Sequence, residues 1–297
     1  DAETGFVVDT LTGDLTDQPI ANISTTGTLS VTATGSIGTS GNGLVINVAM
    51  ITALNAGVND LNVDLVTAVT TTISMLDAKS ASIATLNTVE FGANNWAVSE
   101  DLNLISGDGI TQSGTVTVGG TTTLEATNDV ILSDVLNDFA SVQITGAGSV
   151  LLGDKNALTV GGKTRSDLTV TAATQLTLTD TVVSGALDVT GTTGLTSSAA
   201  VIVVGTASLE TGAGADISLS GANDFKDEVT LDSGGMAAIT DINDVTLGGD
   251  VQGDLALTAG GLVDLTTLTA QDDVSVVTSG GIRQTALNAL TVTGDTT

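Results

Sequence analysis

The chain has 297 residues, with 34 Asp or Glu against 6 Lys or Arg, so its formal net charge is −28. A surface this acidic repels nucleic acids and anionic membranes, and neither is an expected partner. The sequence contains no Cys and no His, which excludes thiolate metal sites, cysteine nucleophiles and a Ser-His-Asp triad. Aromatic residues are only 2% of the chain and hydrophobic residues 41%, so we expect a core of small aliphatic side chains in thin stacked strands.

The first hundred residues carry the least regular pattern. Leu29-Ser30-Val31 alternates apolar and polar residues, and we expect the solenoid to have begun by about residue 25. Residues 44–90 hold fewer such triplets; a short helix over 72–79 is one alternative there, although abundant Val, Ile and Thr favour strands. The longest apolar stretch, 44–58, is interrupted by Asn and Gly and is too short for a membrane insertion.

From about residue 100 onward the sequence repeats itself with a period of 85 to 87 residues. The segment 101–113 returns as 273–285, two periods later, and 109–113 has a middle copy at 194–198. A long fixed period of this kind indicates a solenoid of stacked coils. We therefore divide 101–297 into repeats over 102–186 and 187–273 and a partial copy over 274–297.

Within each repeat, short apolar-polar-apolar triplets recur between turn residues. Examples are Leu102-Asn103-Leu104, Leu168-Thr169-Val170 and Val274-Ser275-Val276, and Gly, Asn, Asp, Ser and Thr lie between them. This alternation is typical of strands with one buried face, joined by tight turns. The sequence predicts an all-β fold, a right-handed parallel β-helix (β-solenoid) of about 14 coils of roughly 21 residues, with three short strands per coil. We expect one continuous solenoid over 1–297, with less regular N-terminal coils over 1–100.

Asparagine and an aromatic residue recur together at matching places. Two of these motifs lie 86 residues apart, and a third, related one precedes them. We expect structural corners, because Asn and Asp side chains bond the backbone at a bend while the aromatic ring covers the edge of the coil. A sugar-stacking role for the ring is the alternative. The residues of these corner motifs are Asn94, Asn95 and Trp96; Asn137, Asp138 and Phe139; and Asn223, Asp224 and Phe225.

The sequence gives little indication of a catalytic, cofactor or metal site. Because there is no His and Arg165 and Arg283 lie far apart, we expect no convergent catalytic set and predict that the protein is not an enzyme. A polysaccharide-cleaving activity, as in other parallel β-helices, is the less favoured alternative. No cofactor or metal site is predicted. Since the nonapeptide calcium-solenoid motif does not occur, any Ca²⁺ binding would be incidental.

Two stretches of the repeat resemble a known family. Residues 281–285 lead into 289–292, and 137–139 lead to 156–162. This pattern resembles the filamentous haemagglutinin-type exoproteins of two-partner secretion and the related β-strand-repeat adhesins of bacteria. The resemblance implies a secreted, rod-shaped protein that acts in adhesion, aggregation or biofilm formation.

We therefore expect an extracellular structural or adhesive protein of a bacterial cell surface or matrix, and part of a longer repeat protein. Its expected partners are surface or matrix glycans, proteins, or further copies of itself. The alternative is a subunit that forms an extracellular filament by end-to-end stacking, because open coil ends expose strand edges that invite another copy.

Overall fold

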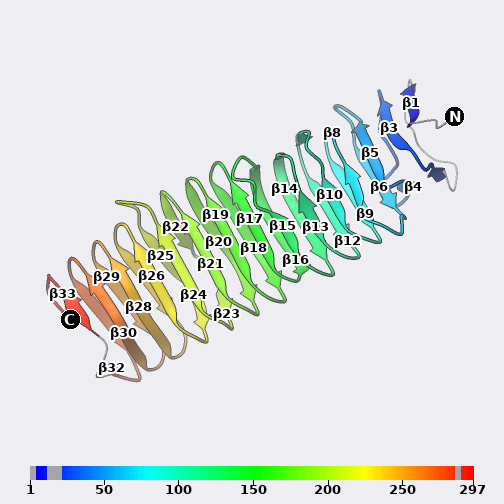
Figure 1. The fold of residues 1–297 in the computed structure, drawn as a ribbon. Helices are drawn as coiled ribbons and strands as arrows, with labels where there is room; N and C mark the ends of the chain where they lie inside the picture. Colours follow the sequence, from blue (N-terminus) through cyan, green and yellow to red (C-terminus); the bar gives the residue numbers. More distant parts are fainter. Residues whose placement is uncertain (1–4, 12–21, 285–288) are drawn as a thin grey trace. The chain divides into compact units, whose positions relative to one another are not determined.

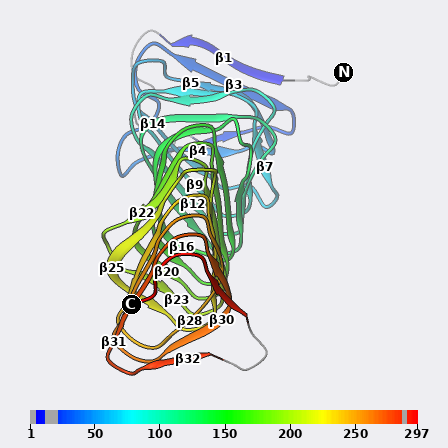
Figure 2. The same ribbon diagram turned by 90° about the vertical axis from the view of Figure 1, so that its left-hand side faces the viewer.

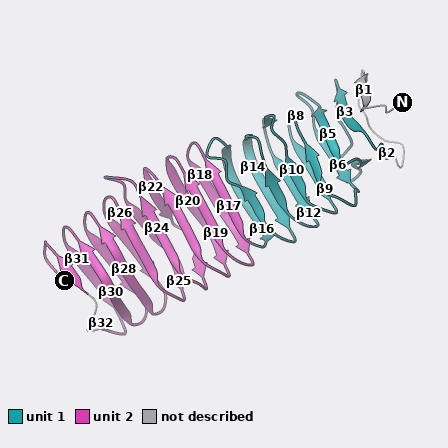
Figure 3. Cartoon of the chain, viewed as in Figure 1, with its two compact units in different colours: residues 1–148 teal, residues 149–297 magenta. Residues whose placement is uncertain are grey.

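The computed structural model describes residues 5–11, 22–284 and 289–297, and the regular structure of these residues consists of β-strands without any helix. The strands pair in parallel and form about 13 turns of a β-solenoid, which confirms the predicted parallel β-helix. The chain divides into two compact units, unit 1 over residues 1–148 and unit 2 over residues 149–297 (Figure 3).

Unit 1 contains the coils drawn from blue to green in Figure 1. β1 (Gly5–Leu11) pairs in parallel with β3 (Thr28–Ala33), so the pairing of turns has begun before residue 25, in agreement with the sequence. Residues 72–79 contribute to β7 (Thr71–Ile73) and β8 (Leu76–Ala78) rather than to a helix, as their β-branched residues favour. The remaining strands are β2 (Asn22–Ser24), β4 (Leu44–Asn47), β5 (Met50–Asn55), β6 (Leu61–Leu65), β9 (Ala81–Thr85), β10 (Val89–Phe91), β11 (Trp96–Val98), β12 (Leu102–Ser106), β13 (Ile110–Gln112), β14 (Val116–Ala126), β15 (Val130–Leu132) and β16 (Asp138–Ala147).

Unit 2 contains the coils drawn from green to red, and in Figure 2 its turns follow one another in close succession. Its interior strands pair with a strand one turn earlier and a strand one turn later. The strands are β17 (Val150–Asp154), β18 (Leu158–Thr164), β19 (Leu168–Ala172), β20 (Gln175–Val183), β21 (Leu187–Gly191), β22 (Gly194–Ser197), β23 (Val201–Val203), β24 (Ala207–Thr211), β25 (Ile217–Phe225), β26 (Val229–Ser233), β27 (Ala237–Asp241), β28 (Val245–Val251), β29 (Leu255–Ala259), β30 (Val263–Ala270), β31 (Val274–Thr278), β32 (Ile282–Gln284) and β33 (Leu290–Val292).

One turn takes 18 to 24 residues. Ala237 pairs with Leu255 across one of the shortest turns, and Ile37 pairs with Leu61 across the longest. The predicted coil of roughly 21 residues falls within this range. Because paired strands lie about 4.8 Å apart, equivalent side chains of successive turns stack in columns at that spacing.

Alternate residues of each strand point inward and form the core. In β12, Leu102 and Leu104 are 1% and 0% exposed, and in β21 Leu187 and Val189 are 1% and 0% exposed. The residues between them face outward, as the predicted period of two requires. Each buried aliphatic side chain contributes about 1.5–3 kcal/mol, so the stacked columns are the main source of stability in each unit.

Several strands end in a buried Ser or Thr at the point where the strand meets a turn. Ser106 Oγ donates to the carbonyl oxygen of Gly109 (2.9 Å), and Thr211 Oγ1 donates to that of Ala215 (2.8 Å). Both hydroxyl residues are buried. They satisfy turn carbonyls that the coil interior shields from water.

Candidate functional site

The two asparagines that recur 86 residues apart, Asn137 in unit 1 and Asn223 in unit 2, are fully buried. Asn137 Oδ1 accepts a hydrogen bond from the backbone N–H of Val116 (2.9 Å), and Asn223 Oδ1 accepts one from Val201 (3.0 Å). These donors lie one turn earlier in the chain, which the sequence analysis did not predict. The expected bonds to the local backbone are present as well, because the Nδ2 groups donate to the carbonyl oxygens of Leu132 (3.1 Å) and Leu219 (3.0 Å). Asn223 Nδ2 also donates to the carbonyl oxygen of Thr240 (2.8 Å). Both asparagines therefore tie neighbouring turns together.

The aromatic rings of the corner motifs lie in the interior. Trp96, Phe139 and Phe225 are 0%, 1% and 2% exposed. Trp96 stacks on Phe91 with ring centroids 3.9 Å apart, and its Nε1 donates to the carbonyl oxygen of Ile73 (2.9 Å). The rings therefore fill the core rather than cover a coil edge, and they present no face on which a sugar could stack.

The other polar members of the corner motifs differ in exposure. Asn94 and Asn95 are exposed in the turn before β11, and Asn95 Oδ1 accepts a hydrogen bond from Thr115 Oγ1 (2.9 Å). Asp138 is half-buried at the start of β16. The motifs of Trp96 and Phe139 lie in unit 1, and the motif of Phe225 lies in unit 2.

The third motif belongs to a charged cluster. Asp224 Oδ2 lies 2.7 Å from Lys226 Nζ, and its Oδ1 accepts a hydrogen bond from Asn243 Nδ2 (3.0 Å). Burial raises the pKa of Asp224, but these contacts outweigh it and hold the pKa below its ordinary value. Asp241 is buried and accepts the backbone N–H groups of Phe225 (2.8 Å) and Asn243 (2.7 Å). Burial raises the pKa of this carboxyl despite the two donors.

A second recurring pattern, not anticipated from the sequence, joins an aspartate to a glycine one turn later. Asp167 Oδ1 accepts the backbone N–H of Ala186 (2.8 Å), and Gly185 directly precedes that residue. A Cβ on Gly185 would lie 2.1 Å from the same Oδ1, so the carboxylate reaches the amide only because the side chain is missing. The same arrangement joins Asp101 with Gly120, Asp216 with Gly235, Asp244 with Gly261 and Asp273 with Gly294.

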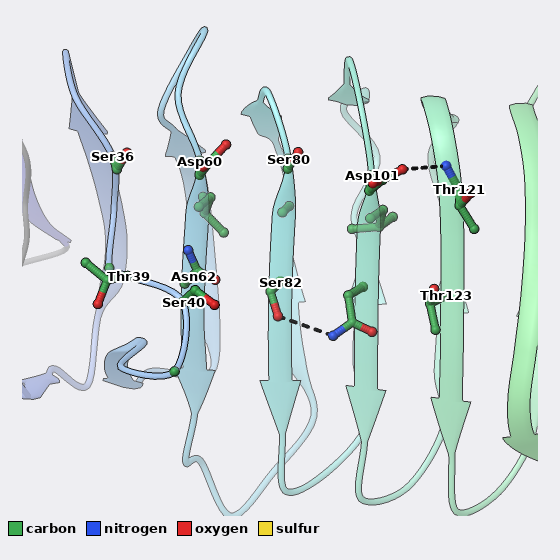
Figure 4. Close-up of a pocket in the computed structure, with 16 residues that line it drawn as sticks. Ser36, Thr39, Ser40, Asp60, Asn62, Ser80, Ser82, Asp101, Thr121 and Thr123 are labelled. Carbon is green, nitrogen blue, oxygen red and sulfur yellow. Dashed lines mark hydrogen bonds between the residues drawn. The ribbon is translucent and has the colours of Figure 1, made fainter.

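Unit 1 also carries a polar groove of about 590 Å³ on the outward face of β6, β9, β12 and β14. Two rows of side chains line its floor, and each row takes one residue from each successive turn (Figure 4). The first row consists of Ser36, Asp60, Ser80, Asp101 and Thr121, and the second of Asn62, Ser82, Asn103 and Thr123.

A tight loop bounds one end of the groove. Thr39 and Asn42 exchange two backbone hydrogen bonds of 3.1 and 2.9 Å, and Gly41 between them has a φ of 81°. Gly38 also has a positive φ, and a Cβ there would lie 2.2 Å from the carbonyl oxygen of Asn62. Glycine therefore lets the loop lie directly against β6, where Figure 4 shows it beside the floor.

The groove offers hydroxyls, amides and two carboxylates, and none of its 16 lining residues is Lys or Arg. Part of the floor is internally bonded: Asn103 Nδ2 donates to Ser82 Oγ (3.3 Å), and the N–H of Thr121 donates to Asp101 Oδ1 (2.8 Å). Within the described ranges, no three Asp or Glu side chains gather as metal ligands. The same ranges contain no helix with the length and hydropathy of a membrane span.

Three stretches of the chain, 78–146, 165–232 and 252–297, match a family described as repeats of unknown function (DUF5649). Together they cover more than half of the 297 residues. The chain belongs to the DUF5649 family. The DUF5649 matches begin at residues 78, 165 and 252, a spacing of 87 residues that agrees with the period found in the sequence. No curated protein and no solved structure matches the chain.

A DUF5649 repeat does not close a whole number of turns. In unit 2, four successive strand pairings lead from Leu195 to Val274, so four turns span 79 residues. The counterpart of Leu195 one repeat later is Ile282, which pairs with Val263 in a neighbouring column. Each repeat therefore advances four turns and one further strand, whereas the sequence had suggested four coils.

Proposed function

We propose that this DUF5649 protein is a non-enzymatic, secreted structural and adhesive β-solenoid of a bacterial cell surface or extracellular matrix, within a longer repeat protein. The main support for this proposal is that the residues that recur along the chain have structural roles. The buried asparagines, Asn137 and Asn223, bond adjacent turns, the rings of Phe139 and Phe225 fill the core, and the aspartate–glycine pairs join one turn to the next. What recurs in this chain builds the solenoid itself.

Two physical properties support an adhesive role. Parallel pairing bonds each interior turn to the turns before and after it, so the outward faces form a stiff surface. Hydroxyl, amide and carboxylate side chains stand on those faces in rows with a spacing of about 4.8 Å. Many equivalent weak contacts on one stiff surface add up to strong attachment, while the acidic charge keeps separate copies soluble.

Antibodies raised against unit 2 test the location and the role together. We expect them to label intact producing cells without permeabilisation, and we expect a strain that lacks the gene to adhere less to glycan-coated or protein-coated surfaces. Labelling that requires permeabilisation, combined with unchanged adhesion, contradicts the proposal. Cleavage of polyuronates by the purified protein would favour the polysaccharide-cleaving alternative instead.

A second candidate is the subunit of a filament formed by end-to-end stacking. It is favoured by the parallel pairing that already joins successive turns, because the same pairing could join one copy to the next. Electron micrographs over a range of protein concentrations test the candidate. Concentration-dependent filaments are expected, and single particles at the highest concentration refute it.

A further inference from the structure

The groove of unit 1 contains hydrogen-bonding groups that the fold does not use. Among the described residues, no side-chain partner is found for the Asp60 carboxylate, the Asn62 amide or the Thr123 hydroxyl. Ser82 accepts a hydrogen bond from Asn103 (3.3 Å) and keeps its own hydrogen to donate. These side chains line the groove in Figure 4, where water or a ligand can satisfy them.

The charge of the groove selects among ligands. Asp60 and Asp101 are both exposed in the first row, and the lining contains no cation to balance them. Phosphates, sulfates and uronates are repelled both here and by the net charge of −28. A ligand rich in hydroxyl groups that also carries positive charge meets both the hydrogen-bonding and the electrostatic demands of the site.

The spacing of the groups suits an extended ligand. The floor residues from Asn62 to Thr123 come from four successive turns, so they recur about every 4.8 Å. Asp60 and Asp101 are two turns apart, which places the carboxylate-bearing positions about 10 Å from each other. An extended chain of pyranose rings presents hydroxyl groups at each ring and the same face at every second ring, which matches this pattern of one polar group per turn and one carboxylate per two turns.

We propose that the groove of unit 1 binds an amine-bearing saccharide chain that runs across the turns. The sugar hydroxyls lie on the row from Asn62 to Thr123, and the ammonium groups lie beside Asp60 and Asp101. The proposal rests on the adhesive function proposed above and names the ligand class of one of its surfaces. Because the lining contains no aromatic residue, binding depends on hydrogen bonds and charge, and it weakens as salt is added.

Calorimetric titration of the full chain with defined oligosaccharides tests the proposal. Glucosamine oligosaccharides are the probe, fully acetylated oligosaccharides of the same length test the need for the amine, and galacturonate oligosaccharides test the sign of the charge. We expect the glucosamine hexasaccharide to bind, the acetylated one to bind more weakly and the galacturonate series not to bind. A disaccharide of glucosamine, which reaches only one carboxylate, binds more weakly than the hexasaccharide.

Variants locate the binding. Asp60→Asn combined with Asp101→Asn is expected to weaken the glucosamine hexasaccharide about tenfold, as two exposed charge pairs would. Ser82→Tyr fills the groove with a residue that strands tolerate and abolishes binding. Asp216→Asn combined with Asp232→Asn is the matched control in unit 2, since both aspartates are exposed and Asp216, like Asp101, accepts a backbone N–H one turn later (2.9 Å). A thermal melt of each variant confirms folding before the titration.

The results that overturn the proposal are distinct from those that overturn the adhesive function. Failure of the glucosamine oligosaccharides to bind, or an equal loss in the control pair, overturns the groove as their site. An oligolysine peptide that binds with the same affinity and the same dependence on Asp60 and Asp101 overturns the saccharide as ligand. Surface labelling and reduced adhesion of the gene-deleted strain are measured separately, so the adhesive function stands or falls without the groove.

Discussion

Replacement of Asn223 by Ala tests how strongly a buried asparagine ties two turns together. The side chain is 0% exposed; its Oδ1 accepts the N–H of Val201, and its Nδ2 donates to the carbonyl oxygens of Leu219 and Thr240. In Asn223→Ala the N–H group of Val201 stays buried without an acceptor. The two carbonyl oxygens each lose one donor, which costs less free energy because a carbonyl oxygen has a second lone pair for another bond. With about 1–3 kcal/mol for an unsatisfied buried group, we expect the free energy of unfolding of unit 2 to fall by about 2–4 kcal/mol.

Amide hydrogen exchange measures this effect locally, because a repeat solenoid need not unfold in one step and a global denaturation curve averages over its turns. The Val201 amide should exchange faster in Asn223→Ala, in proportion to the lost stability of its turn. Asn243→Ala is the matched control in the same unit: it removes one exposed side-chain hydrogen bond, to Asp224 (3.0 Å), and should cost no more than about 1 kcal/mol. A Val201 amide that exchanges as slowly in Asn223→Ala as in the parent chain would refute the reasoning.

Three further predictions concern single contacts. Gly185→Ala brings a Cβ to 2.1 Å from Asp167 Oδ1, so amide hydrogen exchange in the adjacent turns should show a loss of stability of about 1–3 kcal/mol, and a smaller loss when Asp167→Ala is present as well. Burial raises the pKa of Asp241, so the folded state holds this proton to higher pH than the unfolded chain does; stability therefore falls as pH rises from the ordinary aspartate pKa through the raised one, and Asp241→Asn should flatten that part of the curve. An unchanged slope would argue against this assignment. Trp96→Phe removes the hydrogen bond to Ile73 (2.9 Å) and should destabilise unit 1 by about 1–3 kcal/mol. Because Trp96 is the single tryptophan and is fully buried, native emission should be blue-shifted and should move to the red as unit 1 unfolds.

The coil architecture could be predicted because it depends on local alternation. In Leu102-Asn103-Leu104 the two leucines are buried and the asparagine between them faces outward, which is what period-two patterning requires. The same reasoning gave preference to strands over a helix at 72–79, where β7 and β8 lie. Local patterns of this kind need no knowledge of which residues meet across turns.

Contacts between turns could not be predicted, because they depend on register. The partner of Asn223 is Val201, and the partner of Gly185 is Asp167; both pairings are defined only when the length of that particular turn is known. The turns vary between 18 and 24 residues, so no fixed offset finds such pairs in the sequence. The groove was missed for a related reason: the loop at its end depends on the backbone conformation of Gly38 and Gly41, and its floor depends on four turns in register.

The extra strand in each DUF5649 repeat determines the directions in which the repeat displays its residues. Leu195 and its counterpart Ile282 lie in different columns of unit 2, so outward residues next to such counterparts also face different sides. With three strands to a turn, a residue of the repeat would return to its first column only after three repeats. Equivalent residues of successive repeats are therefore displaced by one column per repeat around the solenoid. A partner that recognises one of them would meet it from any side of the solenoid, so attachment would not require the molecule to arrive in one rotational orientation.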